Sequence, residues 1–534
     1  MTAIVKDLLA GELSATGSAD QMLRTAEWAA AAFAGYDRGA VGAIAKAAAA
    51  AGFARAGALA EAAVKETGFG VVEHKKIKNE ITSRGLYDAY RDHDYCSKRV
   101  LAADKIVELP RPAGVVFALT PSTNPVCTVF FKVMLALLTR NTILVSPHPM
   151  AKACSAEAAR LMGEAAERAG APAGVVQVIN EPTLPLVEHI MASPRVKVIL
   201  ATGGVPMVRA AYSSGNPAIG VGPGNAPVLV DASADLEAAA RRIVESKSFD
   251  NSVLCTCESV VVAEQAIADK LLAALARNGA HVLDEDGVAR VRAALFGTGA
   301  FDVGLLGRSA AAIAHKAGVR VPPSARILVA PIDCVGVDEP LSREKLCPVL
   351  GFVRAPHVAA AINVARALVR MAGAGHSAAI HSRTPATIMA YGAAVQALRV
   401  VVNAPCSQGA AGFSTHLAPT FTIGTGFFGR SSVGDNIGPQ HLVNWTRIAY
   451  SDEASEPFGD FTDLEPWSGR QAAAGRDAPM SLGVLQEGAP PRVGAARAPA
   501  HAIRSAAGPV DETAVMREEI RRLVLDELRR ALGS

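Results

Sequence analysis

One cysteine, Cys255, lies in a stretch suited to presenting a reactive side chain, FDNSVLCTCESVVV (249–262). The Asp-Asn-Ser segment at 250–252 consists of turn-forming residues, and the three valines at 260–262 favour a buried strand. A thiol on a turn that a strand holds in place is a common form of nucleophile. Taken alone, the stretch fits a small buried cysteine at the start of a strand equally well.

The remaining cysteines do not form a recognisable metal site. Cys255 and Cys257 are the only close pair, they lack the C-x-x-C spacing of zinc sites, and no run of histidines lies nearby. We therefore predict no metal. The eight cysteines are at positions 96, 127, 154, 255, 257, 334, 347 and 406.

Length and composition narrow the class of protein. The 534 residues are too many for one ordinary core, so two or three domains are expected. Basic and acidic residues number 53 and 50, a balance that argues against a dominant role in binding nucleic acid. The N-terminus does not resemble a secretory signal, and the most apolar region, 126–145, is interrupted by Lys132 and Arg140. We expect a soluble, cytoplasmic protein that does not bind membranes.

The order of the elements predicts an α/β fold. Residues 20–70 have the apolar spacing of helices, and from residue 114 strands alternate with helices, which indicates parallel sheets. Ligands bind at the carboxyl ends of such strands, where the loops at 120–125, 146–149 and 202–205 lie. The strands are expected at residues 114–121, 141–149, 175–180 and 196–204, with a Gly/Pro-rich strand pair at 217–231.

The composition changes after Trp467. The segment up to Val510 is rich in Pro, Gly and Ala and favours a disordered linker. The last 24 residues instead carry apolar side chains at helical spacing, with Asp511 as a candidate cap. A lone helix of this length is marginal in water, so its apolar face needs a partner.

Glycine-rich turns give a weaker indication. No G-x-G-x-x-G lies between a strand and a helix, so there is no Rossmann fingerprint. The segment ATGG (201–204) ends an expected strand and opens a helix, where backbone N–H groups can face a diphosphate or a nicotinamide.

The motifs together are more specific than any one of them. In their order along the chain, from about residue 20 to about residue 448, the sequence resembles the aldehyde dehydrogenase superfamily, and within it the CoA-acylating branch. The motifs that carry this resemblance are PSTNP (121–125), TRNTILVSPHPMAK (139–152), ILATGGVPMVRAAYSSGNPAIGVGPGNAPVLVD (199–231), FDNSVLC (249–255), REKLCPVL (343–350), GAGHSAAIHS (373–382) and LAPTFTIGTGFFG (417–429).

The resemblance implies a fold and its division. It implies an α/β fold with a cofactor domain and a catalytic domain, each on a mainly parallel sheet, and a small β oligomerisation element near 100–112 and 434–450. The expected division is 1–232 for NAD and CoA binding, 233–430 for catalysis, 431–450 for the oligomerisation strand, 466–510 for the linker and 511–534 for the amphipathic helix.

The resemblance also implies a mechanism. Cys255 is the family nucleophile, whose thiolate attacks the aldehyde and then carries a thioester. Asn124, in PSTNP, matches the family's oxyanion-hole asparagine and acts with the Cys255 backbone N–H. Glu344 matches the glutamate that binds the nicotinamide ribose. The expected cofactor-binding residues are Ser146, Pro147, His148, Thr202, Gly203, Gly222, Glu344 and Gly424.

One departure from the family bears on the type of reaction. Hydrolytic members carry a glutamate, in an E-L-G-G-K pattern, that activates water; the aligned residue here is Val221, in VGPGN (221–225). The thioester is therefore expected to await the thiol of coenzyme A. His376, in the G-x-G-H of this branch, either helps to activate that thiol or is a buried structural histidine. Cys257 and Cys347 are expected to be structural.

The predicted reaction is therefore aldehyde, CoA and NAD⁺ to acyl-CoA and NADH. Two alternatives remain: a hydrolytic NAD(P)-dependent aldehyde dehydrogenase that releases a carboxylic acid, and a non-catalytic assembly protein with a degenerate enzyme core. The aldehyde itself cannot be read from the sequence, so propionaldehyde, lactaldehyde, acetaldehyde and sulfoacetaldehyde all stay open.

The C-terminal segment has a resemblance of its own. The linker and the helix at 511–534 resemble the encapsulation peptides of bacterial microcompartment cargo enzymes. This implies shell or cargo proteins as partners and a location inside a microcompartment. A helix that docks back on its own oligomer is the alternative, and a homodimer or tetramer is expected from the family.

Overall fold

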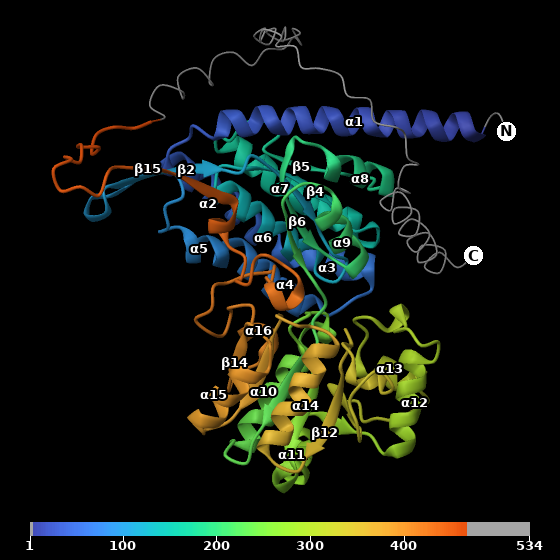
Figure 1. The fold of residues 1–534 in the computed structure, drawn as a ribbon. Coiled ribbons are helices and arrows are strands. Elements are labelled where there is room, and N and C mark those ends of the chain that lie inside the picture. The colour runs from blue at the N-terminus through green and yellow to red at the C-terminus, as the bar shows by residue number, and fades with distance from the viewer. Residues whose placement is uncertain (1–3, 467–534) are drawn as a thin grey trace, which may run out of the picture. The chain divides into compact units, whose positions relative to one another are not determined.

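Three β-sheets organise the part of the chain that the structure describes (Figure 1). This computed structural model describes the backbone of residues 4–466 and the side chains of residues 17–466. The expected linker beyond Pro466 and the helix expected at 511–534 lie outside the described residues.

Two of the sheets are parallel, as the alternation of strands and helices predicts. The first has the order β5 (Val176–Val178), β4 (Thr142–Ser146), β3 (Val115–Leu119), β6 (Val196–Thr202) and β7 (Ala218–Val221). The second has the order β10 (Ala280–Val282), β11 (Ile327–Pro331), β12 (Val349–Ala355), β9 (Glu258–Glu264), β8 (Ala226–Val230), β13 (Ala378–His381) and β14 (Val400–Val402).

The third sheet is small and antiparallel. It joins β1 (Arg99–Leu101), β2 (Ile106–Pro112) and β15 (Val443–Ala449), which lie far apart in the sequence. These strands are where the sequence predicts the small β element.

Helices cover both faces of each parallel sheet. Helices α6 and α7 pack on one face of the five-stranded sheet, and α1, α8 and α9 on the other; α12–α15 and α10, α11 and α16 flank the seven-stranded sheet. The helices are α1 (Ile4–Phe33), α2 (Arg38–Ala54), α3 (Ala56–Thr67), α4 (Val72–Glu80), α5 (Leu86–Tyr90), α6 (Pro125–Leu138), α7 (Lys152–Arg168), α8 (Leu184–Ala192), α9 (Val205–Ser213), α10 (Leu236–Ser248), α11 (Gln265–Arg277), α12 (Glu285–Phe296), α13 (Ala310–Lys316), α14 (Val358–Met371), α15 (Pro385–Ala394) and α16 (Cys406–Gly409).

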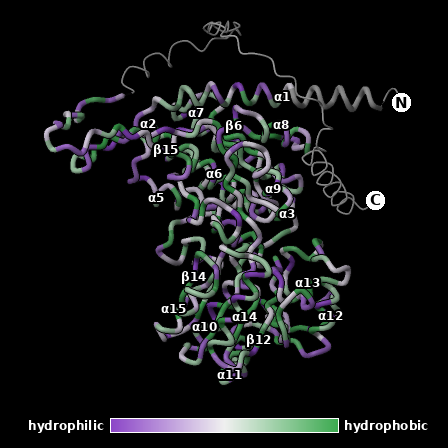
Figure 2. Tube along the Cα trace, viewed as in Figure 1, coloured by the Kyte–Doolittle hydropathy of each residue, from purple (hydrophilic) through white to green (hydrophobic). Residues whose placement is uncertain are grey.

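The central strands are apolar on both faces because both are covered. In β9, Val260 and Val262 join the core on one face, while Val261 and Ala263 join the core on the other. Figure 2 shows hydrophobic residues along the part of the chain around β12, the strand that pairs with β9. The run of valines that follows Cys255 is thus a buried strand, and it anchors the loop that carries the thiol.

The charges that interrupt the apolar region 126–145 are buried. The Lys132 ammonium donates to the carbonyl oxygens of Leu119 (2.6 Å) and Leu200 (2.8 Å), and so ties α6 to the ends of β3 and β6. The Arg140 guanidinium donates to the Ala34 carbonyl oxygen at 2.9 Å. Among the described residues no individual helix has the length and composition of a membrane span; α2 and α3 meet that test only as a pair bent by 60°.

One feature of the chain differs from the prediction. The expected strand pair at 217–231 is two strands in different sheets, because β7 pairs with β6 in one parallel sheet and β8 pairs with β9 and β13 in the other. The turn at 222–225 therefore carries the chain from one sheet to the other, and strand β8, expected in the first domain, belongs to the second sheet.

Candidate active site

Cys255 lies in the short loop between η4 (Phe249–Ser252) and β9. The three residues Asp250, Asn251 and Ser252 have positive φ angles of 50°, 51° and 63°, so the chain turns sharply just before the thiol. This confirms the turn that the Asp-Asn-Ser segment predicts. Cys255 is partly exposed, whereas Cys257 is buried and its thiol donates to the Ser246 carbonyl oxygen at 3.5 Å.

The imidazole of His376 lies against the Cys255 thiol. Its Nε2 atom is 3.2 Å from Cys255 Sγ, and its Nδ1 atom is 3.0 Å from Ser377 Oγ. The side chain is fully buried. Burial, assisted by the charge of Arg399, lowers the pKa of His376 to about 3, so the ring is neutral at working pH. A neutral imidazole at this distance can accept the proton of the thiol.

The thiol itself is protonated in the resting site. Although Cys255 is partly exposed, the groups packed around its thiol limit hydration, and this desolvation raises the pKa of Cys255 to about 12; the charges of Glu344 and Cys257 add to the increase. Cys255 and His376 therefore form a neutral thiol–imidazole pair. A thiol in this state can act as a nucleophile only after it loses its proton.

Three glycines allow the backbone to close around Cys255. A Cβ atom on Gly224 would lie 2.0 Å from the Cys255 carbonyl oxygen, and one on Gly375 would lie 1.7 Å from the Thr425 carbonyl oxygen. A Cβ atom on Gly373, whose φ is 82°, would likewise lie 2.5 Å from Asn225 N. The loops around 224, 374 and 425 can meet at the thiol because these residues have no side chain.

A buried arginine fastens the same loops. Arg399 donates to the carbonyl oxygens of His376 (2.8 Å) and Gly375 (2.6 Å), and also to that of Gly424. Burial lowers the pKa of Arg399 to about 10. Gly424, expected at the cofactor, thus holds Arg399 through its carbonyl oxygen.

Glu344 is the acidic side chain of this cluster. Its Oε1 atom accepts a hydrogen bond from Gly224 N at 3.0 Å. Burial raises the pKa of Glu344 to about 7, against the lowering effect of that bond. The carboxyl is thus held at the loop that also touches Cys255.

Asn124 approaches the thiol loop from the other parallel sheet. It precedes α6, and its Nδ2 donates to the Val253 carbonyl oxygen at 3.1 Å. Its Oδ1 accepts from Lys78 Nζ at 2.5 Å. The structure therefore places the Cys255 thiol against His376, and Asn124 against the same loop two residues before the thiol.

The remaining expected cofactor residues lie at strand ends of the five-stranded sheet. Ser146 and Pro147 are buried at the end of β4 and His148 is exposed. Thr202 ends β6 with its Oγ1 3.4 Å from that of Thr422, and Gly203 follows. Gly222 follows β7, and a Cβ atom there would meet nothing within 4 Å. These residues form an edge of the sheet rather than part of the cluster around Cys255.

A cavity of about 310 Å³ reaches Leu254, the residue before the thiol. This volume lies in the range of ligand pockets. Apolar residues make up half of its lining and polar or charged residues the other half: Ile77, Ile81, Phe249, Leu254, Phe413 and Phe421, with His74, Lys78, Glu245, Arg326, Ser407 and Gln408. Within the described residues, no group of three or more His, Cys, Asp or Glu side chains is placed to hold a metal ion.

Sequence reasoning missed Arg399, Lys78 and Asp250. Arg399 precedes β14, and nothing in its local sequence marks it. Lys75 and Lys78 have the i, i+3 spacing of one helix face, and Asp250 stands in the motif of the nucleophile. The recurrence of lysine on one face of α4 was the available signal.

Comparisons with known proteins agree with this fold. Residues 10–287 match the aldehyde dehydrogenase family. The chain is 39% identical over 399 residues to the aldehyde-alcohol dehydrogenase of Clostridium acetobutylicum. The matched region covers 73% of this chain and 46% of that protein. It is 38% identical to the succinate-semialdehyde dehydrogenase (acetylating) of Clostridium kluyveri, over 74% of this chain and 88% of the relative. The chain thus spans about half the length of the first of these relatives and most of the second.

Solved structures agree as well. An acetylating aldehyde dehydrogenase from Geobacillus thermoglucosidasius is 36% identical, with a TM-score of 0.81 over 84% of this chain and 99% of that one. A propionaldehyde dehydrogenase from a Clostridium phytofermentans fucose utilisation microcompartment is 30% identical, with a TM-score of 0.75 over 82% and 98%. The propionaldehyde dehydrogenase of Rhodopseudomonas palustris, solved with CoA and an acylated cysteine, is 27% identical, with a TM-score of 0.74 over 81% and 97%. With the fold and the thiol site described above, these matches show that the chain belongs to the aldehyde dehydrogenase family.

Proposed function

We propose that the protein is a CoA-acylating, NAD-dependent aldehyde dehydrogenase. The observation that carries the proposal is the 3.2 Å contact between the Cys255 thiol and the neutral imidazole of His376. The acylating activity named for the Clostridium kluyveri and Geobacillus relatives supports it. So does Val221, which is 4% exposed and stands where hydrolytic members carry a glutamate.

In the acylation step, Cys255 attacks the aldehyde carbonyl carbon while its proton passes to His376 Nε2. The carbonyl π electrons move to oxygen, and Asn124 Nδ2 with the Cys255 backbone N–H stabilises the negative charge. Loss of a hydride from the former aldehyde carbon would turn this adduct into a Cys255 thioester. NAD⁺, when bound, would supply the hydride acceptor.

The residues at the strand ends fit a dinucleotide. The N-cap residue of α9 is Gly204, which has no side chain to cap the helix, so the N–H groups of Val205 and Met207 are available to a diphosphate, while Pro206 has none. Thr202 and Gly203 precede it, and Ser146, Pro147 and His148 lie at the end of β4, where the adenosine ribose is expected. Glu344 and Gly222 complete the expected set, and we keep NAD rather than NADP as the proposed cofactor.

In the second step, the thiol of coenzyme A attacks the thioester carbon and Cys255 leaves as the thiolate. His376, once it has released its first proton to solvent, is placed to accept the thiol proton of CoA and to pass that proton to the leaving Cys255 thiolate. The Rhodopseudomonas palustris relative was solved with CoA and an acylated cysteine, which supports this order of events. The cavity at Leu254 suits the chain of a short aldehyde.

The decisive experiment measures NADH production with and without CoA. We expect Cys255→Ala to abolish CoA-dependent NADH formation, while Cys257→Ala, the matched thiol on the same segment, retains it. Full turnover of the native enzyme in water without CoA would instead favour the hydrolytic alternative. Activity retained in Cys255→Ala would contradict the mechanism.

We further propose that the protein is microcompartment cargo bound through residues 511–534. The apolar spacing of that segment supports this, and the Clostridium phytofermentans relative comes from a microcompartment. Removal of residues 511–534 is expected to leave NADH production unchanged and to abolish co-purification with shells. Unchanged association with shells would contradict the proposal.

We also propose a homodimer or tetramer that forms through the small sheet. Strand β15 pairs with β2 on one side, and β15 is the last strand in the order β1-β2-β15. An edge strand of this kind offers free backbone N–H and C=O groups to a second copy.

A further inference from the structure

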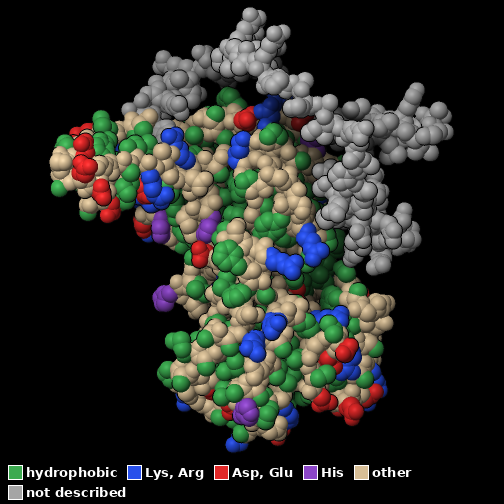
Figure 3. Space-filling model, viewed as in Figure 1, with side chains coloured by type: hydrophobic (Ala, Val, Ile, Leu, Met, Phe, Trp, Pro, Cys, Tyr) green, Lys and Arg blue, Asp and Glu red, His purple; other side chains and the backbone are tan. Residues whose placement is uncertain are grey.

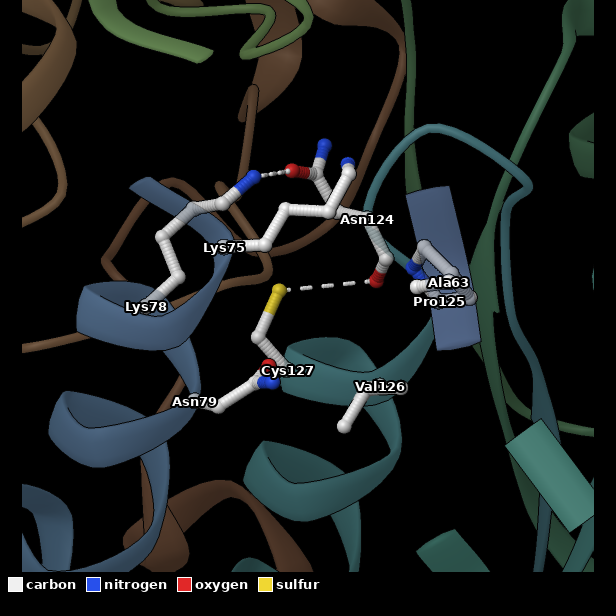
Figure 4. Close-up of a pocket in the computed structure, with 8 residues that line it drawn as sticks. All are labelled: Ala63, Lys75, Lys78, Asn79, Asn124, Pro125, Val126 and Cys127. Carbon is white, nitrogen blue, oxygen red and sulfur yellow. Dashed lines mark hydrogen bonds between the residues drawn. The ribbon is translucent and has the colours of Figure 1, made fainter. Parts of the chain in front are cut away.

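The lysine at position 78 connects the asparagine beside the thiol to a buried ion pair. Lys78, on α4, is 2% exposed, and its Nζ donates to Asn124 Oδ1 at 2.5 Å and to the Asp250 carboxylate. Figure 4 shows the Lys78 side chain extending from its helix toward the amide of Asn124. Sequence reasoning assigned no role to this residue.

The carboxylate of Asp250 holds Lys78 in place. Asp250 is fully buried, accepts from Val71 N at 2.6 Å and pairs with Lys75 Nζ at 3.1 Å as well as with Lys78. Burial alone would raise the pKa of Asp250, but the charges of Lys78 and Lys75 outweigh it and lower the pKa. Asp250 is therefore ionised.

The ammonium also determines the orientation of the Asn124 amide. An ammonium is a donor only, so the atom facing Lys78 must be the amide oxygen, and the opposite arrangement is excluded. Nδ2 must then point the other way, and it donates to the Val253 carbonyl oxygen at 3.1 Å, two residues before Cys255. The same contact polarises the amide, which makes Nδ2–H a stronger donor.

We propose that Lys78 is a positioning residue that orients and polarises Asn124, so that its amide stabilises the oxyanion formed on Cys255. This inference rests on the proposed function, in which Asn124 donates to that oxyanion. Lys78 acts through Asn124 and not on the substrate. Asp250 in turn holds Lys78, and it belongs to the same tight turn that presents the thiol.

The test is a double-mutant cycle between Lys78→Met and Asn124→Ala. Loss of an oxyanion donor lowers kcat by about 100- to 1,000-fold, and we expect Lys78→Met to lower kcat by about 10- to 100-fold with the aldehyde KM changed by less than about threefold. In the Asn124→Ala background, Lys78→Met is expected to cause less than about a threefold further loss. Multiplying losses would mean that Lys78 acts independently of Asn124, and would overturn the proposal.

Lys75→Met is the matched control. It removes the other lysine of Asp250 from the same helix, but Lys75 donates to the Thr123 carbonyl oxygen and not to the Asn124 amide. We expect its kcat to remain within about threefold of the native value. An equal loss in both lysine variants would show that the ion pair only maintains the fold.

A double variant, Lys78→Gln with Asp250→Asn, covers the case in which Lys78→Met does not fold. It removes the charge of Asp250 together with that of Lys78 and keeps groups that can hydrogen-bond; Lys75 loses its carboxylate partner but keeps the Thr123 carbonyl oxygen. We expect native-like thermal unfolding with kcat still lowered at least tenfold; recovery of kcat together with stability would overturn the proposal.

If Asn124→Ala retains native kcat, the oxyanion role itself fails, whereas a loss in Asn124→Ala without one in Lys78→Met refutes only the inference about Lys78.

Discussion

At the scale of single residues, the reactive centre is a pair of neutral groups rather than a thiolate–imidazolium pair. Burial raises the pKa of Cys255 to about 12 and lowers that of His376 to about 3. Each shift favours the uncharged form, because an isolated charge is costly in a buried site. In the mechanism that we propose, deprotonation of the thiol is therefore coupled to its attack on the aldehyde.

This protonation state predicts how the thiol reacts with iodoacetamide. For the protein without cofactor, the alkylation rate of Cys255 should rise about tenfold per pH unit from pH 6 to 9 without a plateau, because thiolate is a minor species below its pKa. Mass spectrometry of the Cys255 peptide measures the rate. Free cysteine is the control, and it levels off near its pKa of about 8.5. A plateau at Cys255 below pH 9 would mean that the thiolate is already formed.

A second buried acid, Glu258, affects stability rather than chemistry. It is fully buried at the start of β9, its Oε1 accepts from Cys406 N at 3.0 Å, and its Oε2 has no hydrogen-bond partner among the described residues. Burial raises its pKa from 4.5 to about 7. The folded state therefore keeps a proton that the unfolded state releases between these pH values.

Because the folded state binds more protons, the free energy of unfolding should fall as pH rises from about 4.5 to about 7. A shift of this size corresponds to about 3 kcal/mol. Glu258→Gln keeps the acceptor for Cys406 N but does not titrate, so its stability should change by less over that range. Urea unfolding of both proteins at pH 5 and pH 8 measures the difference. Equal pH dependence in the two proteins would refute this role of Glu258.

At the scale of elements, loops from both parallel sheets create the site. The turn at 222–225 connects β7 to β8 and touches the loop of Cys255, while Arg399 fastens the loops at 375 and 424. The approach is close enough that Gly224 leaves no room for a side chain. Small residues in these loops are thus a requirement of packing.

Gly224→Ala should therefore displace the nucleophile. The added Cβ would lie 2.0 Å from the Cys255 carbonyl oxygen, so the loop must shift; overpacking of this kind costs about 1–3 kcal/mol. We expect a lower melting temperature and at least a tenfold fall in kcat. Gly392→Ala on α15, where a Cβ meets nothing within 4 Å, is the control and should leave both unchanged or slightly raise stability. Native kcat in Gly224→Ala would contradict the close packing.

At the scale of the whole molecule, the small sheet projects a strand edge to solvent. On the face that Figure 3 shows, acidic side chains gather over the segment that follows β15. That segment is held to the sheet by Lys105, which donates to the Glu453 carbonyl oxygen at 2.6 Å, and by the Lys98–Glu465 ion pair at 2.8 Å. Ile448 on β15 is 40% exposed.

If β15 joins two copies of the chain, Ile448→Lys should weaken the assembly. A lysine at the edge opposes pairing with a second strand, so the mass in solution should shift toward the monomer. Light scattering after size-exclusion chromatography measures it. Met389→Lys on α15, at a 74% exposed position, is the control and should keep the native mass. An unchanged mass in Ile448→Lys would place the interface elsewhere.

Much of this protein was determined by its sequence alone. The alternation of apolar runs and helical spacing predicts an α/β fold with parallel sheets, because burial requires that pattern locally. The small sheet was predicted from the family resemblance. Cys255, Asn124, Glu344 and His376 were found because each stands in a short motif. The turn before Cys255 followed from its residue types.

The tertiary structure alone decided how the parts meet. Strands β7 and β8, adjacent in sequence, separate into different sheets, because their pairing depends on partners far along the chain. Lys78 meets Asn124 across 46 positions and Asp250 across 172. Such contacts leave no local pattern, since a lysine on a helix is ordinarily solvated and only the folded chain buries this one against a carboxylate and an amide. For the same reason, the neutral state of the Cys255–His376 pair depends on burial that no motif records.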